Sequence, residues 1–564
     1  MATLSKNEAI KEGSRGLRGT LAQGLAQAET GAVSEDDAQL TKFHGVYLQD
    51  DRDLRPERAR RRMEKAFGFM ARVRIPAGRL TAAQYLALDT IARERSSGTL
   101  RLTTRQTVQF HGILKSNLRP AMQALHASLL DTIAACGDAN RNVIACVHEG
   151  RSPAHAEAAA LARRLSEHLL PKSHAWHDLF IDGEPLLPEG ASAEAEPILG
   201  PAYLPRKFKI AIAVPPQNDV DVFAHDLGFI AVVEDGAVAG WNVTAGGGMG
   251  MTHGEPDTFP RLGDVIGFCP TEAVVAVAEA AVTVQRDWGD RADRRHARLK
   301  YTIERRGLPA FVAEVERRAG VVLAPARPVA FSGNGDAMGW VARADGLWDY
   351  CLFIENGRVG GALAAGIRAL ASAHGGELVL TPNQNLVVAG ISAEVRPSIE
   401  AVLAEHGLGA DVSVLRRNAM ACVALPTCGL ALAESERALP GLVSRLEVAL
   451  AAAGLAEVPI VLRMTGCPNG CARPYVAEIG IVGTGPGAYN LYLGGAGDGT
   501  RLNKLYRRSL PADGIVDALA PLFHAFAAGR EAGESFGDYA IRAGVVRATT
   551  SGRAFHDDVA ARAG

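Results

Sequence analysis

The sequence predicts an α+β protein (mixed α/β) made of two related halves, and three observations lead to this prediction. Stretches of the first half recur in the second in the same order. Each half begins with short β-type runs followed by an Ala-rich helical stretch. The later part of each half alternates helical patterns with apolar strands, which favours a larger α/β unit.

The repeat is the strongest of these observations. Four pairs of stretches match in the same order, and the shift between partners is 279, 278 and 276 residues for the first three pairs and 248 for the fourth. The pairs are "ARVRIPAGRL" (71–80) with "YCLFIENGRV" (350–359), "GTLRLTTRQTVQFHG" (98–112) with "GELVLTPNQNLVVAG" (376–390), "RNVIACV" (141–147) with "RNAMACV" (417–423), and "NVTAGGGMG" (242–250) with "NLYLGGAGDG" (490–499). The third pair places Cys146 over Cys422. We therefore expect a pseudo-two-fold protein in which only one half carries a full set of cysteines.

The elements follow the same order in both halves. The opening β-type runs are "FMARVRIP" and "WDYCLFIE", and the helical stretches after them are "TAAQYLALDTIARE" and "ALAAGIRALASAHG". Later, "PAHAEAAALARRLSEHLL" and "GLVSRLEVALAAAG" are predicted as helices, and "FKIAIAVP" and "VPIVLRM" as strands. The first sixty or so residues contain few periodic apolar positions, so we expect an extended arm packed on the body.

Composition excludes several classes of protein. The chain has 564 residues, 48% of them hydrophobic and 22% charged, which indicates an ordinary globular protein of several domains. The formal net charge of -2 suggests neither a nucleic-acid nor a membrane partner. No apolar run approaches the ~18 residues of a membrane span, and the N-terminus shows no export signal. We expect a cytoplasmic protein.

Four of the eight cysteines form a pattern, C-x5-C-x38-C-x3-C, from Cys422, Cys428, Cys467 and Cys471. Each pair is flanked by Pro or Gly, which turn the backbone. Four thiolates hold an iron–sulfur cluster, and the spacing of such ligands varies widely. A four-cysteine zinc site usually spaces each pair by two to four residues, so the pattern disfavours zinc without excluding it. The others are predicted to be structural: Cys136, Cys146, Cys269 and Cys351.

Both cysteine motifs, with "LRLTTRQTVQFHGILK", "LPRKFK", "GGGMG" and "VQRDWGDRADRRHARLKYTIERRG", resemble those of the sirohaem-containing sulfite and nitrite reductases. The resemblance runs from about Phe43 to "GESFGDYAIRAGVV" near the C-terminus, and it is greatest to the haemoprotein (β) subunits of assimilatory NADPH-sulfite reductases. It implies a sirohaem and a [4Fe-4S] cluster bound by the four cysteines, with Cys471 also bridging to the sirohaem iron.

The resemblance also implies a domain plan with two ferredoxin-like half-units joined in one domain and two larger α/β units. The expected ranges are 1–68 for an N-terminal arm that contacts a partner, 69–135 and 336–406 for the ferredoxin-like half-units, 136–335 for a sirohaem and substrate domain, and 407–564 for an iron–sulfur and sirohaem domain.

Basic residues on strands are candidates for an anion site, because a small hydrated anion needs fixed positive charge in a dry cavity. Arg72 and Arg74 share one strand face, and we expect a solvent or ion-pair role for Arg74. In "RLTTRQTVQFHG", four polar side chains at odd positions face one way if the segment is a strand, and a water-exposed face is the alternative. They are Arg101, Arg105, Gln109 and His111. Lys207 and Lys209 also share a face, and a solvated strand edge is their alternative.

The resemblance assigns roles to these positions. It implies that four residues surround the substrate oxygens, bind the anion and supply protons: Arg72, Arg141, Lys207 and Lys209. It implies sirohaem contacts at Arg101, Arg105, Gln109, Arg206, Gln384 and Arg473, with His111 as a weaker candidate. Asn383 stands where the first half has Arg105. Sirohaem nitrite reductases tend to carry Asn at the position of Lys209, so this lysine favours sulfite.

The glycine-rich segment "GIVGTGPGAYNLYL" is not a nicotinamide-binding fingerprint, because Pro486 and a further strand stand where a helix should start. Electrons must therefore come from a partner. The resemblance implies an NADPH-oxidising flavoprotein (α) subunit, with ferredoxin as the alternative donor. The expected reaction is the six-electron reduction of sulfite to sulfide in sulfate assimilation and cysteine biosynthesis. The alternatives are nitrite reduction to ammonia or, in another class, a cluster-only electron carrier or a zinc-stabilised structural protein.

Overall fold

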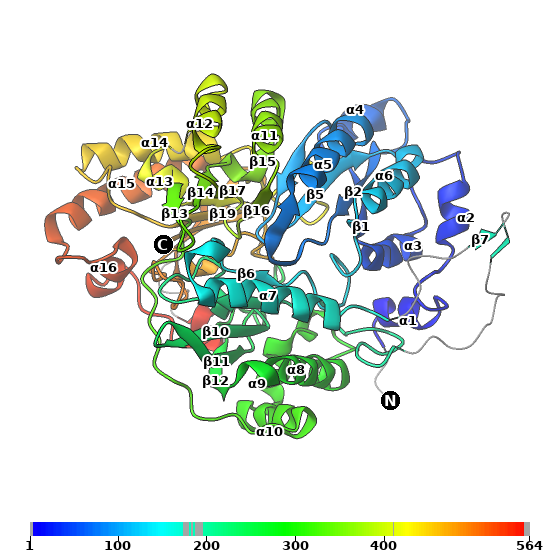
Figure 1. Ribbon diagram of the computed structural model, residues 1–564, viewed down its shortest axis with the longest axis horizontal. Helices are drawn as coiled ribbons and strands as arrows, with labels where there is room; N and C mark the ends of the chain where they lie inside the picture. The colour runs from blue at the N-terminus through cyan, green and yellow to red at the C-terminus, as the bar shows by residue number, and fades with distance from the viewer. Residues whose placement is uncertain (1–3, 173–179, 182–183, 186–195, 410, 558–564) are drawn as a thin grey trace.

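The computed structural model describes residues 4–172, 180–181, 184–185, 196–409 and 411–557. In this part of the chain, four five-stranded sheets form the body, and helices cover them (Figure 1). A separate two-stranded hairpin consists of β7 (Phe180–Ile181) and β8 (Glu184–Pro185). None of the described helices is long and apolar enough to cross a bilayer.

Two of the sheets are small, and each carries two helices. The first has the order β1 (Val46–Asp50), β2 (Phe67–Arg72), β5 (Val108–Ile113), β4 (Leu100–Leu102) and β15 (Arg358–Val359), with helices α5 (Ala82–Arg95) and α6 (Lys115–Ala127). The second has the order β13 (Gly339–Ala342), β14 (Trp348–Leu352), β17 (Leu386–Ile391), β16 (Glu377–Leu380) and β3 (Arg79–Thr81), with helices α11 (Gly361–His374) and α12 (Arg396–Glu405). Their apolar side chains form one shared core.

The two small sheets exchange strands. β15 comes from the second half but pairs with β4 of the first, and β3 comes from the first half but pairs with β16 of the second. A glycine in the left-handed region precedes each exchanged strand, Gly78 at φ +73° and Gly357 at φ +71°. A Cβ at either position would come within 2.4 Å of a carbonyl oxygen, that of Leu380 or Leu102. Only glycine fits both the conformation and the close approach.

The two larger sheets share one topology. Their orders are β6 (Ile144–Ala145), β9 (Ile210–Ala213), β10 (Leu227–Glu234), β11 (Ala237–Ala245) and β12 (Asp264–Cys269), and β18 (Ala419–Ala421), β19 (Leu462–Thr465), β20 (Ile479–Gly485), β21 (Ala488–Leu493) and β22 (Lys504–Leu510). In both, the first three strands are parallel and the last two antiparallel. The repeat in the sequence therefore extends to every sheet of the body.

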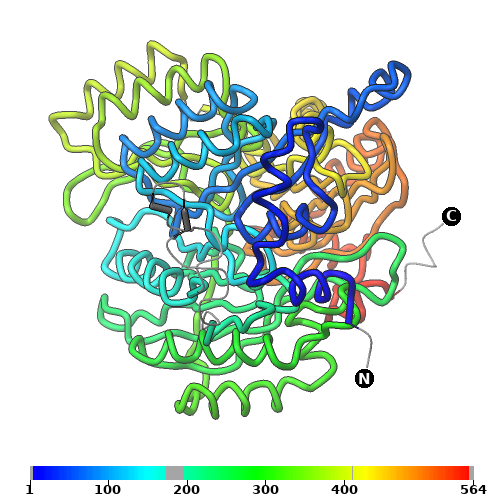
Figure 2. The backbone as a smooth tube through the Cα atoms, turned by 90° about the vertical axis from the view of Figure 1, so that its right-hand side faces the viewer, coloured from blue at the N-terminus to red at the C-terminus, as the bar shows by residue number. Residues whose placement is uncertain are grey.

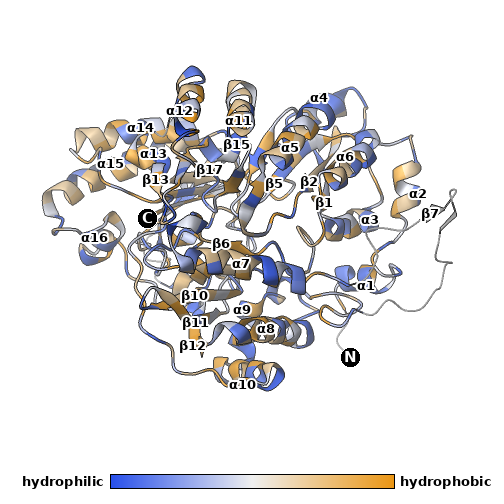
Figure 3. Ribbon diagram, in the orientation of Figure 1, coloured by the Kyte–Doolittle hydropathy of each residue, from blue (hydrophilic) through white to orange (hydrophobic). Residues whose placement is uncertain are grey.

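Helices bury the apolar strands of the larger sheets, which is why runs such as β9 are apolar at every position. The helices are α7 (Pro153–His168), α8 (Val274–Trp288), α9 (Leu299–Arg306) and α10 (Leu308–Ala319) in the first half, and α14 (Leu439–Ala452), α15 (Ala512–Gly529) and α16 (Phe536–Arg542) in the second. Each half has its own core. In Figure 3, strands β10 to β12 are mostly orange, as expected for a buried sheet.

The N-terminal segment differs from the expected extended arm. It contains α1 (Lys6–Glu12), α2 (Leu21–Ala26), α3 (Glu35–Leu40) and α4 (Arg55–Arg60), and β1 joins the first small sheet, which thus begins before residue 69. Helices of six or seven residues have too few turns to show a periodic apolar face. Buried ion pairs stabilise the first one, since Glu8 and Lys11 bind each other and Glu8 also binds Arg291. Figure 2 shows this blue segment crossing one side of the molecule.

Candidate functional site

The four patterned cysteines gather at one end of the second large sheet. Cys422 directly follows β18, and Cys467 lies two residues after β19. These neighbouring strands are parallel, so their carboxyl ends lie side by side, where open α/β sheets place their ligands. Cys428 and Cys471 lie on the loops that continue from those ends. All four thiols are free, as are the other four cysteines.

The thiols lie close enough to affect one another's ionisation. Burial, followed by the Cys471 sulfur, raises the pKa of Cys422 to about 12 and that of Cys428 and Cys467 to about 11. Among the described residues, no three His, Cys, Asp or Glu side chains are gathered tightly enough for one metal ion. A four-iron cluster does not require that, because each thiolate binds a different iron. The set of donors therefore fits a [4Fe-4S] cluster.

The loop between the last two cysteines is shaped to present sulfur. The Gly466 amide donates to Cys422 Sγ at 3.4 Å, and Asn469 Nδ2 donates to Cys467 Sγ at 3.5 Å. Gly470 adopts φ +61°, which turns the chain between Cys467 and the exposed next cysteine. Hydrogen bonds to sulfur favour the thiolate that a metal cluster needs.

A glycine loop braces this cysteine loop from the first half. The Met251 amide donates to the Pro468 carbonyl at 2.9 Å. The buried Lys300 ammonium holds the glycine loop by donating to three carbonyls, those of Gly248 (3.1 Å), Gly250 (2.7 Å) and Phe259. The two halves are thus in contact at the cysteines.

A row of polar side chains crosses the first small sheet. Arg72 lies opposite Gln109, Gln109 opposite Arg101, and Arg101 opposite Arg358 on the exchanged strand β15. His111 lies two residues beyond Gln109 on the same face. Three strands, not one, bring the predicted residues of the first half together. The prediction of a single strand through "RLTTRQTVQFHG" was wrong, because β4 and β5 form a hairpin.

This row is tied to the cysteine half. Arg101 Nη2 donates to the Ala421 carbonyl at 2.9 Å, next to Cys422. Glu436, from the same half, binds Arg101 at 3.1 Å and Arg358 at 2.6 Å. The cationic row therefore lies against the predicted cluster site.

The equivalent row of the second small sheet is apolar at three of its four positions. Its members are Cys351, Val387, Val379 and Arg79, in the same order across the strands. The first three are buried in a cluster with Val147, Ala389 and Met338. Of these two rows in the described part of the chain, only that of the first sheet is polar at all four positions.

Arg105 lies in the turn between β4 and β5, not on a strand. Its guanidinium contacts His225 Nδ1 at 3.3 Å and donates to the carbonyls of Ile210 (3.1 Å) and Asn142. Burial, and then the charges of Arg473 and others, lowers its pKa to about 9. This reflects positive charge in excess of the local negative charge.

Several buried polar atoms around the row have no partner in the described part of the chain. They are Arg72 Nε, Arg105 Nε, His111 Nε2 and Gln384 Oε1. Gln109 has only a weak hydrogen bond, from Nε2 to Met70 Sδ at 3.4 Å. Buried polar groups are normally satisfied, so their orphaned state fits a bound polar group. A macrocycle with many carboxylates, as in sirohaem, fits this surplus of donors. By contrast, Arg74 pairs with Asp131, which confirms its predicted ion-pair role.

Lys207 and Lys209 lie just before β9, and in the described part of the chain neither ammonium has a hydrogen-bond or ion-pair partner. Burial lowers the pKa of both well below the ordinary lysine value, and Arg298 lowers it further. The Cys471 sulfur raises the pKa of both, so it lies near them. Two lysines without partners thus lie within electrostatic range of the last cysteine, which belongs to the other half.

Arg141 and Arg206 also lie near Lys207, and each guanidinium already contacts a group of the protein. Arg141 donates to the carbonyls of Gly137 (2.8 Å) and Ala135 (3.3 Å). Arg206 lies 3.7 Å from Asp138, and burial, followed by nearby arginines, lowers its pKa to about 10. Both are near enough to affect the pKa of Lys207.

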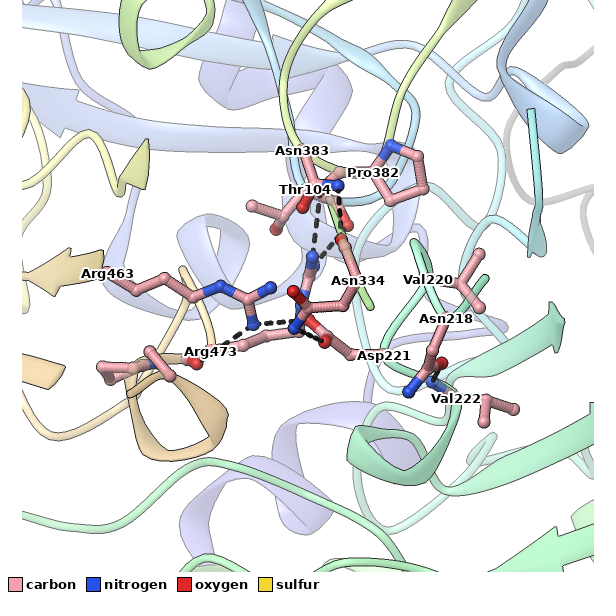
Figure 4. Close-up of polar contacts among 12 residues, drawn as sticks. Thr104, Asn218, Val220, Asp221, Val222, Asn334, Pro382, Asn383, Arg463 and Arg473 are labelled. Atoms are coloured by element: carbon pink, nitrogen blue, oxygen red, sulfur yellow. Dashed lines mark hydrogen bonds and ion pairs between the residues drawn. The ribbon is translucent and has the colours of Figure 1, made fainter. Parts of the chain in front are cut away.

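Arg473 and Gln384 approach from the second half. Gln384 has a positive φ of +72° and donates weakly to the Leu102 carbonyl at 3.4 Å. Arg473 is buried and uses all three of its nitrogens: Nε on Asp221, and the others on the carbonyls of Thr104 (3.1 Å) and Pro382 (3.1 Å) (Figure 4). Its predicted contact with a sirohaem carboxylate competes with these bonds.

The sequence reading missed several carboxylates of the site. Asp226 binds Arg298 at 2.8 Å and accepts from the Lys209 amide at 3.0 Å. Asp221 binds Arg463 at 2.5 Å and also Arg473. A signal was present: "PPQNDVDVFAHDLG" aligns with "CPNGCARPYVAEIG" from Pro216 and Pro468 onward, which places Asp221 over Arg473.

Comparison with known proteins identifies the family of the chain. The model "Nitrite and sulphite reductase 4Fe-4S domain" matches residues 136–323, and "Nitrite/Sulfite reductase ferredoxin-like half domain" matches 61–128 and 342–406. The predicted fold class, with its two ferredoxin-like half-units, is confirmed.

Individual relatives match over nearly the full chain. Sulfite reductase [NADPH] hemoprotein beta-components of Methylobacterium radiotolerans and Chromohalobacter salexigens are 56% and 53% identical, over 98% of this chain and 91% and 97% of their own lengths. The solved structure of Mycobacterium tuberculosis NirA protein is 26% identical, with a TM-score of 0.78 over 96% of this chain and 97% of that one. The chain therefore belongs to the family of nitrite and sulfite reductases, as the cysteine motifs and the cationic row suggested.

Proposed function

We propose that this protein is the haemoprotein subunit of an assimilatory sulfite reductase and reduces sulfite to sulfide with six electrons. The observation that carries the proposal is the meeting of Lys207, Lys209 and Cys471, two ammonium groups without partners beside the last cysteine of the cluster pattern. The names of relatives at 53–57% identity support the same substrate and a sirohaem with a [4Fe-4S] cluster. Its place is in cytoplasmic sulfate assimilation, which feeds cysteine biosynthesis.

The cluster would be held by Cys422, Cys428, Cys467 and Cys471, and the sirohaem by the polar row and Arg105, with Cys471 between them. When bound, these cofactors would supply the redox chemistry by which electrons from the donor reach the substrate. The orphaned donors on Arg72 and Arg105 would bind the macrocycle's carboxylates or the substrate. His111 Nδ1 donates to Gln49 Oε1, so the orphaned Nε2 would accept a hydrogen bond from a bound group.

The lysines have two tasks in this proposal. Their charge, in a site from which the protein excludes water, attracts a dianion strongly. Because burial lowers their pKa, Lys207 and Lys209 give up a proton more readily than an exposed lysine. Arg141 and Arg72 have planar guanidinium groups with several N–H donors, so they serve to bind and orient the substrate oxygens.

The test is an assay of the purified protein reduced by a viologen dye, with sulfite and nitrite as substrates. We expect sulfide as the main product, absorption by an isobacteriochlorin, and acid-labile sulfide. A much higher kcat/KM for nitrite would change the assignment to a nitrite reductase. Absence of both cofactors from freshly made protein would instead point to a zinc-stabilised structural protein, and a cluster without haem to an electron carrier.

We further propose that the electron donor is a flavoprotein α subunit and that it docks on the basic N-terminal segment. Arg52 donates to the Cys428 carbonyl at 3.2 Å and to the Ala431 carbonyl at 2.6 Å, so this segment lies directly against the cluster loop. Next to it, α4 and the residues after it expose Arg60, Arg61, Arg62 and Lys65. α4 is mostly blue in Figure 3.

A basic patch beside a cluster suits an acidic electron-transfer domain, because complementary charge speeds association of transient partners. Exposed apolar side chains accompany the charges, namely Leu54 (40%), Met63 (42%) and Leu430 (68%). NADPH oxidation that requires both sulfite and added flavoprotein would support the proposal. Faster turnover with reduced ferredoxin would favour the other donor.

A further inference from the structure

We propose that Asp221 is a positioning residue that holds the loop bearing Cys467 and Cys471 at both of its ends. The proposal rests on the function proposed above, since it concerns the loop that would present sulfur to both cofactors. Asp221 comes from the first half of the chain, and nothing in the cysteine motif itself points to it.

The carboxylate binds one arginine on each side of the loop. Arg463 lies in β19, before Cys467, and its Nη1 is 2.5 Å from Asp221 Oδ2. Arg473 lies two residues after Cys471, and its Nε binds the same oxygen. Figure 4 shows both guanidinium groups reaching Asp221. The cysteine loop is thus closed at its base by a single carboxylate.

The geometry of Asp221 is itself fixed. Asn334 Nδ2 donates to Asp221 Oδ1 at 2.9 Å, and the Asp221 amide donates to the Asn218 carbonyl at 2.8 Å. Asp221, Arg463 and Arg473 are 0%, 2% and 4% exposed, so the pairing is desolvated and directional. Both arginines bind the same oxygen of Asp221, so loss of this one carboxylate would leave two buried guanidinium groups without their counter-charge.

Arg473 also connects the cysteine loop to the turns of both small sheets. Arg473 donates to the carbonyls of Thr104 and Pro382 at 3.1 Å each. Thr104 Oγ1 in turn donates to the Cys471 carbonyl at 3.1 Å. These turns carry Arg105 and Gln384, two of the predicted sirohaem contacts. Asp221 therefore sets the position of the cysteine loop relative to the rest of the cofactor site.

Asp221 and Arg473 also occupy equivalent places in the two halves. Both adopt the left-handed conformation, Asp221 with φ 48° and ψ 60° and Arg473 with φ 55° and ψ 49°, and both precede a short 3-10 helix. The pseudo-two-fold relates Asp221 and Arg473 to each other, so their ion pair joins equivalent positions of the two halves. A carboxylate and a guanidinium at these equivalent positions can form an ion pair, whereas two identical residues could not.

The test compares Asp221→Asn with Asp221→Glu and Asp89→Asn in the holoenzyme. Asp89 is a matched control, because it is also buried and binds Arg93 and, from the other half, Arg368. In Asp221→Asn we expect faster amide exchange in residues 466–472, a shifted reduction potential of the cluster, and a kcat for sulfite lower by roughly tenfold or more, with KM within about twofold. Asp221→Glu should restore part of kcat, and Asp89→Asn should lower Tm without these effects.

Asn334→Ala keeps the test decisive if Asp221→Asn does not fold, since it removes only one donor to Asp221 and should shift loop exchange and kcat in the same direction by less. Unchanged exchange, potential and kcat in the Asp221 and Asn334 variants would overturn the proposal. So would loss of sirohaem from Arg473→Gln with normal loop exchange, because Arg473 would then act as a cofactor ligand. A wild-type protein that forms no sulfide would refute the proposed function, while the exchange result would still test the role of Asp221.

Discussion

Arg101 lies directly opposite Gln109 across strands β4 and β5, at the centre of the polar row. The equivalent residues of the other small sheet, Val379 and Val387, lie opposite each other in the same way. One backbone arrangement thus accepts either a buried polar pair or a buried apolar pair. The backbone arrangement does not itself require the polar pair, so its presence in one sheet points to a bound group.

The substitution Gln109→Val tests this directly. We expect the free energy of unfolding to change by no more than about 1 kcal/mol, because valine already fills the equivalent site and Gln109 has only a weak bond to Met70. Sirohaem content, measured by visible absorption per protein, should fall. Val387→Ala is the control: it should cost about 2 kcal/mol as a core truncation and leave sirohaem content unchanged. Full sirohaem content in Gln109→Val would remove that residue from the cofactor site.

Much of this architecture could be predicted from sequence. The repeat predicted two halves, and the cysteine spacing favoured an iron–sulfur cluster over a zinc site, because both are carried by residue types in a fixed order. The exchange of β3 and β15 could not be predicted, since a two- or three-residue strand does not specify its partner. The alternation of polar residues likewise could not distinguish a single strand from the hairpin that β4 and β5 form.

The missed residues share a cause. Asp221, Asp226 and Glu436 each bind arginines far away in the sequence, and a lone carboxylate has no local pattern. The first short helix of the N-terminal segment is held by a tertiary ion pair between Glu8 and Arg291 rather than by its own periodicity. Residue patterns therefore predict the chemistry of the site better than they predict the distant carboxylates that hold its arginines in place.

Cys471→Ser should abolish sulfite reduction, with kcat lower by at least about a hundredfold, and should reduce iron and acid-labile sulfide per protein. A serine hydroxyl is not the soft thiolate that iron–sulfur clusters require. Cys351→Ala is the control, because Cys351 is buried in the apolar cluster and should keep full iron content at a cost of about 1 kcal/mol. Activity that survives in Cys471→Ser would show that this residue does not bridge the cofactors.

Binding of sulfite should take up protons at Lys207 and Lys209. Burial lowers their pKa in the free protein, and a bound anion favours the ammonium form and raises it again. Between the two pKa values binding adds protons, so affinity falls as pH rises through that window. Calorimetry of the oxidised protein in two buffers of different ionisation enthalpy measures the uptake.

Lys209→Gln should remove a large part of this proton uptake, and Lys115→Gln, a lysine bound to backbone carbonyls in another part of the chain, should not. Lys209→Asn should also lower kcat/KM for sulfite more than for nitrite. An unchanged uptake in Lys209→Gln would mean that this lysine does not face the anion.

Charge reversal at Arg60 and Arg62 should weaken docking of the donor without affecting the site. Both side chains are exposed beside the segment that contacts Cys428. With the flavoprotein as donor, we expect Arg60→Glu with Arg62→Glu to raise the KM for the donor by roughly tenfold at low ionic strength, and this difference should shrink as salt screens the charges. Activity with a reduced viologen dye should be unchanged, because a small dye needs no protein docking surface.

Arg317→Glu on α10, at the opposite end of the molecule in Figure 1, is the matched control and should alter neither activity. Equal loss of dye-driven and donor-driven turnover would instead indicate that the segment supports the cluster loop, through Arg52, and does not bind the donor.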